Sequence, residues 1–276
     1  MTDINFSNSF VDKSIPYISI SDVLGMLQEP FDQKGVAQKT HYKHFNNPES
    51  EYYQKTVEEI CEMWSAKGAE SRRYGSLLDD YIGFNLNKKT DELELWKLDN
   101  GYEWDERLLA HCNSFDAFYE IVNKSGDMEF VAREKTLYYK FNDYYIKGRF
   151  DALFYNKKTN KWIIIDWKSS DSIDKVPNQY TKKLFGPAIK FYALNHYTYT
   201  IQLHFYKKAL IENYLPKGTT EDDVNVMIEN LPDHIIEPSA KLFETHNEAF
   251  KYDSIFMEQI FSFVIRKKQL INNIKK

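Results

Sequence analysis

Two short runs near the middle of the chain carry the residue types that could do chemistry. The first is Gly148-Arg149-Phe150-Asp151, and the second is Ile163-Ile164-Ile165-Asp166-Trp167-Lys168. Two carboxylates and one ammonium group suit a hard, oxygen-seeking cation such as Mg²⁺ or Mn²⁺. Such a metal would polarise a phosphate and lower the pKa of a bound water, while Lys168 could orient that water or stabilise the developing charge. The two runs therefore predict a metal site that acts on a phosphodiester.

The geometry of a β-hairpin would bring the three side chains together. A polar turn centred between residues 158 and 159 places Asp151 opposite Asp166, with their Cβ atoms about 5 Å apart. Asp166 and Lys168 are two residues apart and project from the same face of their strand. An Asp-x-Lys tripeptide taken alone is usually a solvated ion pair. Here the aspartate follows three isoleucines expected to be buried, which is costly unless the carboxylate binds something.

The elements that must position these residues follow from local patterns. Aromatic and β-branched residues predict strands over residues 130–141, 144–155 and 161–167. Apolar residues at helical spacing predict helices over residues 51–85, 114–123, 197–214 and 254–274, and a short helix between Ser19 and Pro30. The stretch 87–113 is polar and gives no clear pattern. Helices, then strands, then helices again indicate an α/β or α+β core.

Composition sets outer bounds on what the chain can be. It has 276 residues, 42% hydrophobic and 28% charged, with a formal net charge of −5. This charge counts mildly against a coat of non-specific nucleic-acid contacts, although a local basic groove can coexist with an acidic remainder. Two cysteines exclude a disulfide framework and any four-cysteine zinc or iron–sulfur site, which fits a reducing, cytoplasmic setting. No apolar run approaches the length needed to span a bilayer.

The two runs together resemble the core motifs of PD-(D/E)XK nucleases, and most closely those of the RecB-like exonuclease branch without its iron–sulfur cysteines. Phe150 stands where the superfamily usually has a proline, as is common in that branch. The resemblance implies a restriction-endonuclease-like fold, with a central mixed β-sheet flanked by helices and helical N- and C-terminal additions. It implies that Asp151, Asp166 and the carbonyl of Trp167 are metal ligands and that Lys168 is the catalytic lysine.

Further residues extend the resemblance over residues 17–214. Glu134 stands where the branch carries a glutamate on the preceding strand, although an exposed strand carboxylate explains it equally well. Gln202 and Tyr206 resemble the branch's Gln-x-x-x-Tyr motif and share one face of the predicted helix. Helix surface and core packing are the simpler explanation for that pair taken alone.

One position departs from the family pattern. The branch often carries a metal-binding histidine in a Gly-[Thr/Ser]-x-x-His run, and this chain has Gly75-Ser76-Leu77-Leu78-Asp79 instead. A carboxylate suits Mg²⁺ at least as well as an imidazole. Asp79 is therefore a candidate metal ligand, with a plain surface residue beside Asp80 as the alternative.

A backbone-binding groove is a further hypothesis. Lysines and aromatic residues that follow the site could line such a groove, although a solvated face and an aromatic core explain them nearly as well. These residues are Lys182, Lys183, Lys190, Lys207 and Lys208, with Tyr180, Phe191, Tyr192 and Tyr199 as stacking surfaces.

We expect residues 1–16 to be flexible and residues 17–276 to form one nuclease domain with a C-terminal helical extension from about residue 215. By resemblance it would be a Mg²⁺- or Mn²⁺-dependent deoxyribonuclease, an exonuclease acting on single strands or duplex ends in recombination, repair or phage DNA processing. Its setting would be the cytoplasm of a bacterium or phage-infected cell, away from membranes and compatible with protein partners in a DNA-processing complex. The alternatives are a catalytically silent binding module, an RNA-directed endonuclease, and an interaction protein whose last helix pairs with a partner.

Overall fold

The computed structural model describes residues 4–102, 105–169, 176–177, 181–231 and 253–274. Two mixed β-sheets form its centre. The four-stranded sheet has the order β2-β5-β6-β7, with β2 Met128–Arg133, β5 Ala152–Asn156, β6 Lys161–Lys168 and β7 Val224–Asn230. The three-stranded sheet has the order β1-β4-β3, with β1 Tyr17–Ser19, β4 Tyr144–Arg149 and β3 Thr136–Phe141. In each sheet one pair of strands is parallel and the rest are antiparallel.

The prediction of one continuous strand over residues 130–141 and another over residues 144–155 was wrong, because each range contains two strands. The chain leaves the four-stranded sheet after β2 and enters the three-stranded sheet at β3, and β4 and β5 make the same crossing in reverse. Glu134 lies at the first crossing with a φ of 55°, a left-handed conformation that ends a strand. Its N–H donates to the carbonyl of Asp151 at the second crossing (3.1 Å). The long hairpin therefore bends between the two sheets, and we call residues 134–135 and 150–151 the bend.

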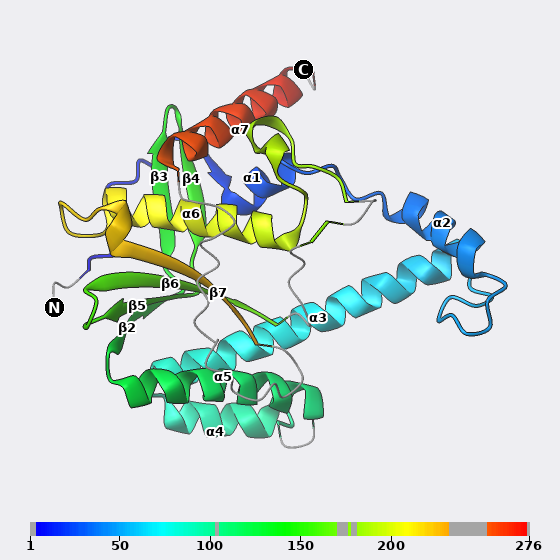
Figure 1. The fold of residues 1–276 in the computed structure, drawn as a ribbon, viewed down its shortest axis with the longest axis horizontal. Helices are drawn as coiled ribbons and strands as arrows, with labels where there is room; N and C mark the ends of the chain where they lie inside the picture. Colours follow the sequence, from blue (N-terminus) through cyan, green and yellow to red (C-terminus); the bar gives the residue numbers. More distant parts are fainter. Residues whose placement is uncertain (1–3, 103–104, 170–175, 178–180, 232–252, 275–276) are drawn as a thin grey trace.

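Helices cover both faces of the four-stranded sheet (Figure 1). Helix α6 (Asn195–Asn213) lies on one face, and α3 (Val57–Leu86) with α5 (Glu106–Ser125) lies on the other. Side chains of β6 alternate between the two cores, with Ile164 on the α6 side and Ile163 and Ile165 on the α3–α5 side. The prediction that this strand is fully buried is confirmed.

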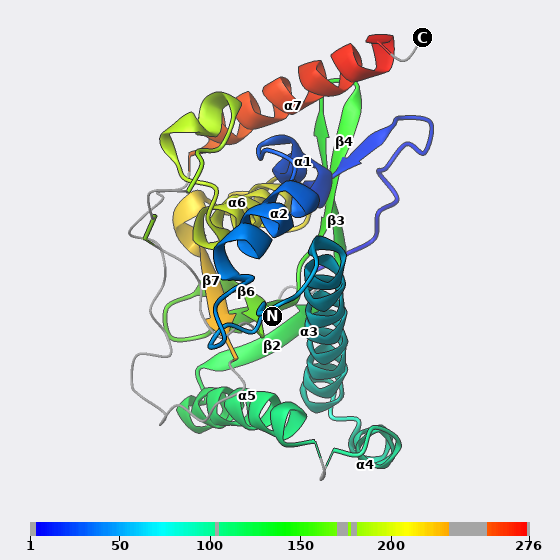
Figure 2. The same ribbon diagram turned by 90° about the vertical axis from the view of Figure 1, so that its right-hand side faces the viewer.

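The other helices agree with the sequence patterns in part. Helix α1 (Ile20–Met26) begins at Ser19, whose hydroxyl accepts from the Asp22 N–H, as its N-cap chemistry predicts. Helix α3 starts at Val57 rather than near residue 51, because Thr56 and Glu59 form a capping box there. Helix α5 is longer than predicted, and α2 (Gln33–His44) and α4 (Thr90–Asp99) were not predicted. Figure 2 shows α3 as a long, straight helix along one side of the molecule, with α2 and α4 near its two ends.

Both ends of the described chain pack against the core. Residues 4–16, expected to be flexible, contact it through Phe6, whose ring lies 5.8 Å from that of Phe150. The region after residue 215 contains β7, which extends the sheet, as well as the expected final helix α7 (Ser254–Ile274). Phe261 and other apolar residues of α7 are buried in the α6-side core, so most of its apolar face already has a partner within the chain. None of the helices in the described ranges has the length and apolar character needed to cross a membrane.

Candidate active site

The bend brings the three central residues of the sequence prediction together. Strands β5 and β6 pair with Ala152 opposite Ile165, and one further step in this register sets Asp151 against Asp166. The predicted register of the hairpin is therefore confirmed. The Trp167 N–H donates to Asp151 Oδ2 (2.8 Å), which ties the first carboxylate to the end of β6.

Asp166 is a carboxylate with almost no access to solvent. It is 1% exposed, and Lys168 Nζ lies 2.6 Å from its Oδ2 as an ion pair. Oδ1 of Asp166 has no hydrogen-bond donor among the residues that the structure describes. Buried carboxylate oxygens normally have such partners, so this oxygen is an exception. It marks a place where a bound group would be stabilised.

The site perturbs the proton affinities of its members. Burial, and then the negative charge of Asp166, raises the pKa of Asp151. Burial also raises the pKa of Asp166, although the Lys168 ammonium opposes this rise. For Lys168, burial disfavours the charged form, but the two carboxylates outweigh it and its pKa is raised. Lys168 is therefore an ammonium group at neutral pH and can donate but not accept a proton.

Helix α6 supports the site from its other side. Lys168 Nζ lies 4.5 Å from the ring centroid of Tyr199, a cation–π distance. One face of the same helix carries Gln202 and Tyr206, and Gln202 Nε2 donates to the buried Tyr206 hydroxyl (2.7 Å). The charges of Asp166 and Asp151 contribute to raising the pKa of Tyr206, after burial as the main cause, so this ring lies near the carboxylates. The predicted sharing of one helix face by Gln202 and Tyr206 is thus seen as a direct contact.

Gly148 explains how α6 can approach so closely. A Cβ atom at this position would lie 2.6 Å from Phe205 Cε1 and 2.7 Å from Tyr206 Cε1. Both atoms belong to large buried side chains of the helix. The glycine of the Gly-Arg-Phe-Asp run therefore allows β4 and α6 to pack at this distance.

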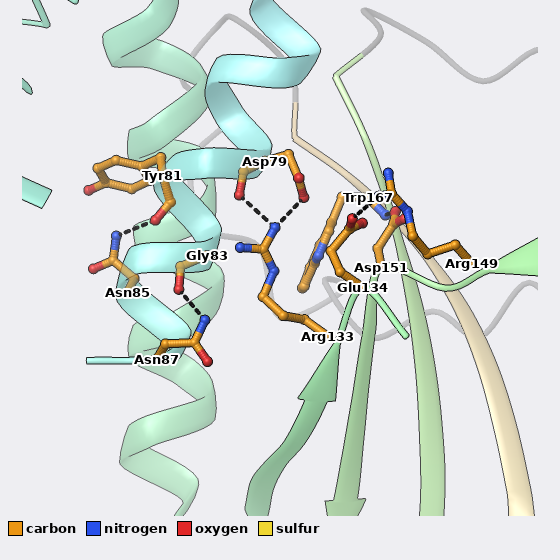
Figure 3. Close-up of polar contacts among 10 residues, drawn as sticks. All are labelled: Asp79, Tyr81, Gly83, Asn85, Asn87, Arg133, Glu134, Arg149, Asp151 and Trp167. Carbon is orange, nitrogen blue, oxygen red and sulfur yellow. Dashed lines mark hydrogen bonds and ion pairs between the residues drawn. The ribbon is translucent and has the colours of Figure 1, made fainter. Parts of the chain in front are cut away.

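Two ion pairs flank Asp151 (Figure 3). Arg149 Nη1 lies 2.6 Å from Oε2 of Glu134, and burial raises the pKa of this glutamate, with Asp79 adding to the effect. On the α3 side, Arg133 Nη2 donates to Oδ1 (2.8 Å) and to the carbonyl (3.0 Å) of Asp79. The two outer carboxylates of the sequence prediction thus lie beside the site, each held by an arginine.

A cavity of about 660 Å³ opens between α3 and the bend. Asp151 lines it, and Asp166 is buried next to Asp151. The charged residues of its lining are Arg72, Asp79, Asp80, Glu134, Arg149 and Asp151. The cavity is therefore polar, large enough for part of a phosphodiester chain, and directly connected to the central carboxylates.

The donor atoms fit a hard divalent cation. Mg²⁺ prefers oxygen ligands and is usually held by one or two carboxylates together with waters and substrate oxygens. Asp151 and Asp166 supply two carboxylates, and Oδ1 of Asp166 has no hydrogen bond from the described residues, so it can coordinate a cation. The Trp167 carbonyl points to the same side of its strand as its N–H, and hence toward Asp151. Among the described residues no group of three His, Cys, Asp or Glu side chains is gathered to hold a metal by itself, so water or substrate would complete the set.

The groove hypothesis for the later lysines is wrong for two of its members. Lys207 and Lys208 are buried, and Lys208 Nζ donates to Ser254 Oγ (2.7 Å), so it joins α6 to α7. Lys182 pairs with Glu29, and Tyr180 lies outside the described residues. Tyr199 was proposed as a stacking surface, whereas the structure places its ring against Lys168.

Sequence reasoning missed the arginine partners. Arg133 precedes Glu134 in the chain, and its link to α3 depends on a residue 54 positions away. Nothing local signals that contact. Tyr199 was named only as a stacking surface, but its place beside the site could have been predicted, because it lies three residues before Gln202 and therefore on the same helix face.

The fold and the site together define a class of protein. A mixed sheet between helix layers, with a buried aspartate and a lysine on β6 opposite a half-buried aspartate at the bend, is the arrangement of a metal-dependent enzyme that acts on phosphate esters. Comparison with protein-family models matches residues 40–259 to the PD-(D/E)XK nuclease superfamily. The chain belongs to this superfamily of metal-dependent phosphodiesterases. A comparison with curated proteins found no match.

Proposed function

We propose that the chain is a Mg²⁺- or Mn²⁺-dependent deoxyribonuclease of the RecB-like branch that degrades DNA from single-stranded or duplex ends. The observation that carries the proposal is the buried carboxylate of Asp166, which pairs with Lys168 through Oδ2, has no hydrogen bond at Oδ1 from the described residues and lies beside Asp151. A carboxylate is rarely left in this state without a function that uses it. A non-catalytic member of the superfamily would have no need for all three residues.

Each residue has a defined role in this proposal. Asp151 and Asp166 hold the metal, with the Trp167 carbonyl as a further ligand. When bound, the metal supplies charge that polarises the scissile phosphate and lowers the pKa of a water. Lys168, held as an ammonium group between Asp166 and the ring of Tyr199, donates to the attacking water or to a phosphate oxygen as negative charge develops.

The surrounding residues position this group of three. The hydrogen bond from Gln202 to Tyr206 orders the α6 face behind the carboxylates. Glu134 contributes to the metal or to a water bound to it, and Asp79 adds negative charge from α3. These roles are based on the resemblance of the Gly-Arg-x-Asp, Asp-x-Lys and Gln-x-x-x-Tyr motifs to those of the RecB-like branch, and the contacts around the bend are compatible with them.

Cleavage of end-labelled single-stranded and duplex DNA, with Mg²⁺ or Mn²⁺, tests the proposal. We expect metal-dependent cutting that starts from an end and is abolished by Asp166→Ala and by Lys168→Ala. A circular single strand of the same length separates the two modes of attack, because an exonuclease leaves it intact. A matched RNA tests the alternative of an RNA-directed endonuclease. If folded wild-type protein cuts neither DNA nor RNA with either metal, the catalytic proposal is wrong and a binding role takes its place.

A further inference from the structure

The two ion pairs beside Asp151 differ in how firmly they are held. Arg133 is 17% exposed, and its guanidinium fills a slot on α3 where a Cβ on Gly83 would lie 1.4 Å from Nη1 (Figure 3). Arg149 is 62% exposed, and its partner Glu134, 2.6 Å away, is 24% exposed, so the pair is open to solvent on the arginine side. An exposed ion pair contributes little to stability, typically about 0.2–1 kcal/mol. Arg149 can therefore exchange Glu134 for another anion at small cost, whereas Arg133 is fixed.

The charges of the cavity show why such an exchange matters. Its lining contains four carboxylates, which are those of Asp79, Asp80, Glu134 and Asp151. A phosphodiester entering this space would be repelled unless cations met it. Among the lining residues that the structure describes, the cationic side chains are Arg72 on α3 and Arg149 at the end of β4, and both are exposed. They approach the cavity from different elements, α3 and the bend.

We propose that Arg72 and Arg149 bind phosphates of the nucleic-acid strand, and that Glu134 holds Arg149 until the strand arrives. This inference rests on the proposed function, because it takes a nucleic acid as the ligand. When Arg149 turns to a phosphate, Glu134 loses its partner and its carboxylate becomes available to the metal site beside Asp151. Substrate binding and completion of the metal site are thereby coupled through one ion pair.

Because of this coupling, loss of the Arg149 side chain should have opposite effects on the binding of nucleic acid and on the binding of metal. Removing the guanidinium deletes one phosphate contact and weakens binding of nucleic acid. The same removal frees Glu134 and takes a positive charge away from the carboxylates, so a metal ion should bind more tightly in the absence of nucleic acid. A residue with a merely structural role would weaken both kinds of binding together.

Strand binding is measured in an Asp166→Asn background, which prevents cleavage. The ligand is a fluorescein-labelled single-stranded deoxyoligonucleotide of about 20 nucleotides, followed by anisotropy at several NaCl concentrations in EDTA. Each phosphate contact on a single strand contributes about 0.7 to the slope of log K against log salt. We expect Arg149→Ala and Arg72→Ala each to lower the slope by about this amount. Lys124→Ala serves as the matched control, because Lys124 is an exposed cation on α5 that pairs with its helix neighbour Glu120, and it should leave the slope unchanged.

Metal binding is measured separately, by Mn²⁺ titration of wild-type protein and Arg149→Ala without nucleic acid. We expect Arg149→Ala to bind Mn²⁺ about two- to fivefold more tightly, from the size of an exposed ion pair. An unchanged salt slope, or weaker Mn²⁺ binding in a folded Arg149→Ala protein, would overturn the inference and leave the proposed nuclease function intact. Failure of the Asp166→Asn parent to bind the strand at all, together with failure of the wild type to cleave it, contradicts the proposed function itself.

Discussion

Two lysines in this molecule are set in similar surroundings but serve different ends. Lys168 in the candidate active site has its Nζ 4.5 Å from the ring of Tyr199 and 2.6 Å from a carboxylate oxygen of Asp166. Lys208 at the junction of α6 and α7 has its Nζ 4.9 Å from the ring of Tyr139 and 3.1 Å from a carboxylate oxygen of Glu258. Each combines an ammonium group, an aromatic ring and an acidic partner.

The difference between the two regions lies in the carboxylates. Glu258 is half exposed, so water satisfies whatever Lys208 does not, and Ser254 adds a hydrogen bond to the same Nζ. Asp166 is only 1% exposed, so water does not reach it, and beyond the Lys168 pair its Oδ1 has no hydrogen bond from the described residues. The Lys208 junction therefore stabilises the fold, whereas the Lys168 site costs stability that a bound metal can offset. This is the pattern of a functional site set into a stable scaffold.

The largest expected effect is a loss of cleavage activity when Asp166 of the candidate active site is replaced. Asp166→Asn keeps the shape of the side chain but removes the charge that holds the metal, and we expect the cleavage rate to fall by about a thousandfold or more, the scale of electrostatic catalysis. Asp80→Asn is the control, because Asp80 is an exposed carboxylate of the same cavity, and it should change the rate by less than about threefold. A steady-state cleavage assay at saturating Mn²⁺ measures both. Comparable losses in the two variants would show that overall cavity charge, not the Asp166 carboxylate, is what matters.

The same substitution made at each of the two lysines separates their roles in catalysis and in stability. We expect Lys168→Met to reduce cleavage about a hundredfold or more, as for loss of a group that stabilises the transition state. The loss of stability should be small, because burial already raises the pKa of Asp166 and this carboxyl can take up a proton once its cationic partner is gone. Lys208→Met should leave the activity of folded protein nearly unchanged and lower the free energy of unfolding by about 2 kcal/mol, the value of hydrogen bonds to a charged group. Urea unfolding and cleavage assays measure the free energy of unfolding and the cleavage rate of each variant. The comparison fails if Lys168→Met proves the more destabilising of the two.

The pH dependence of metal binding follows from the raised pKa values of Asp151 and Asp166. Each carboxyl that still holds a proton must release it before it can bind the metal. Affinity should therefore fall as the pH is lowered, by about tenfold per pH unit where one proton is displaced. Calorimetric Mn²⁺ titrations in buffers of different ionisation enthalpy would count the protons released. No proton release near neutral pH would show that the carboxyls are already ionised.

The metal-free protein should show the opposite trend in stability. The folded-state pKa of each aspartate lies above its unfolded value of about 3.9, so the folded state binds more protons between the two values. Stability from these groups is therefore greatest at low pH and is lost as the pH rises through the folded pKa. The difference in unfolding free energy between wild type and Asp166→Asn, measured in EDTA from about pH 5 upward, isolates the contribution of Asp166.

The smallest expected effect concerns the ring under Lys168. Tyr199→Phe keeps the aromatic face and should change cleavage by less than about twofold. Tyr199→Leu removes a cation–π contact of about 0.5–2 kcal/mol and should reduce cleavage about two- to thirtyfold. Equal effects of the two variants would point to the hydroxyl instead of the ring.

Much of the site could be predicted from sequence because its central part is local. The polar turn and the alternation of two neighbouring strands determine which residues are opposed, and this was enough to pair Asp151 with Asp166. The buried β6 strand and the shared helix face of Gln202 and Tyr206 also follow from short-range periodicity.

The rest of the arrangement depends on contacts between distant segments. The bend needs Glu134, a non-glycine residue, to adopt a positive φ, and tertiary structure imposes this conformation. Strand β7 pairs in parallel with β6 after a long crossover, so no turn signal announces it. The link from Arg133 to Asp79 joins a strand to a helix far away in the chain, and no spacing rule predicts it.

The most direct test of the account is the thermal unfolding of wild type and Asp166→Asn, with and without Mn²⁺. In EDTA we expect the variant to have the higher melting temperature, because it removes one of two mutually repelling acidic groups and leaves Asp151 as a partner for Lys168. With Mn²⁺ the melting temperature of the wild type should rise by several degrees, because the metal binds the folded state. The melting temperature of the variant should not change. A variant that is less stable than wild type in EDTA and still stabilised by Mn²⁺ would contradict the claim that the carboxylate of Asp166 is kept buried for a metal.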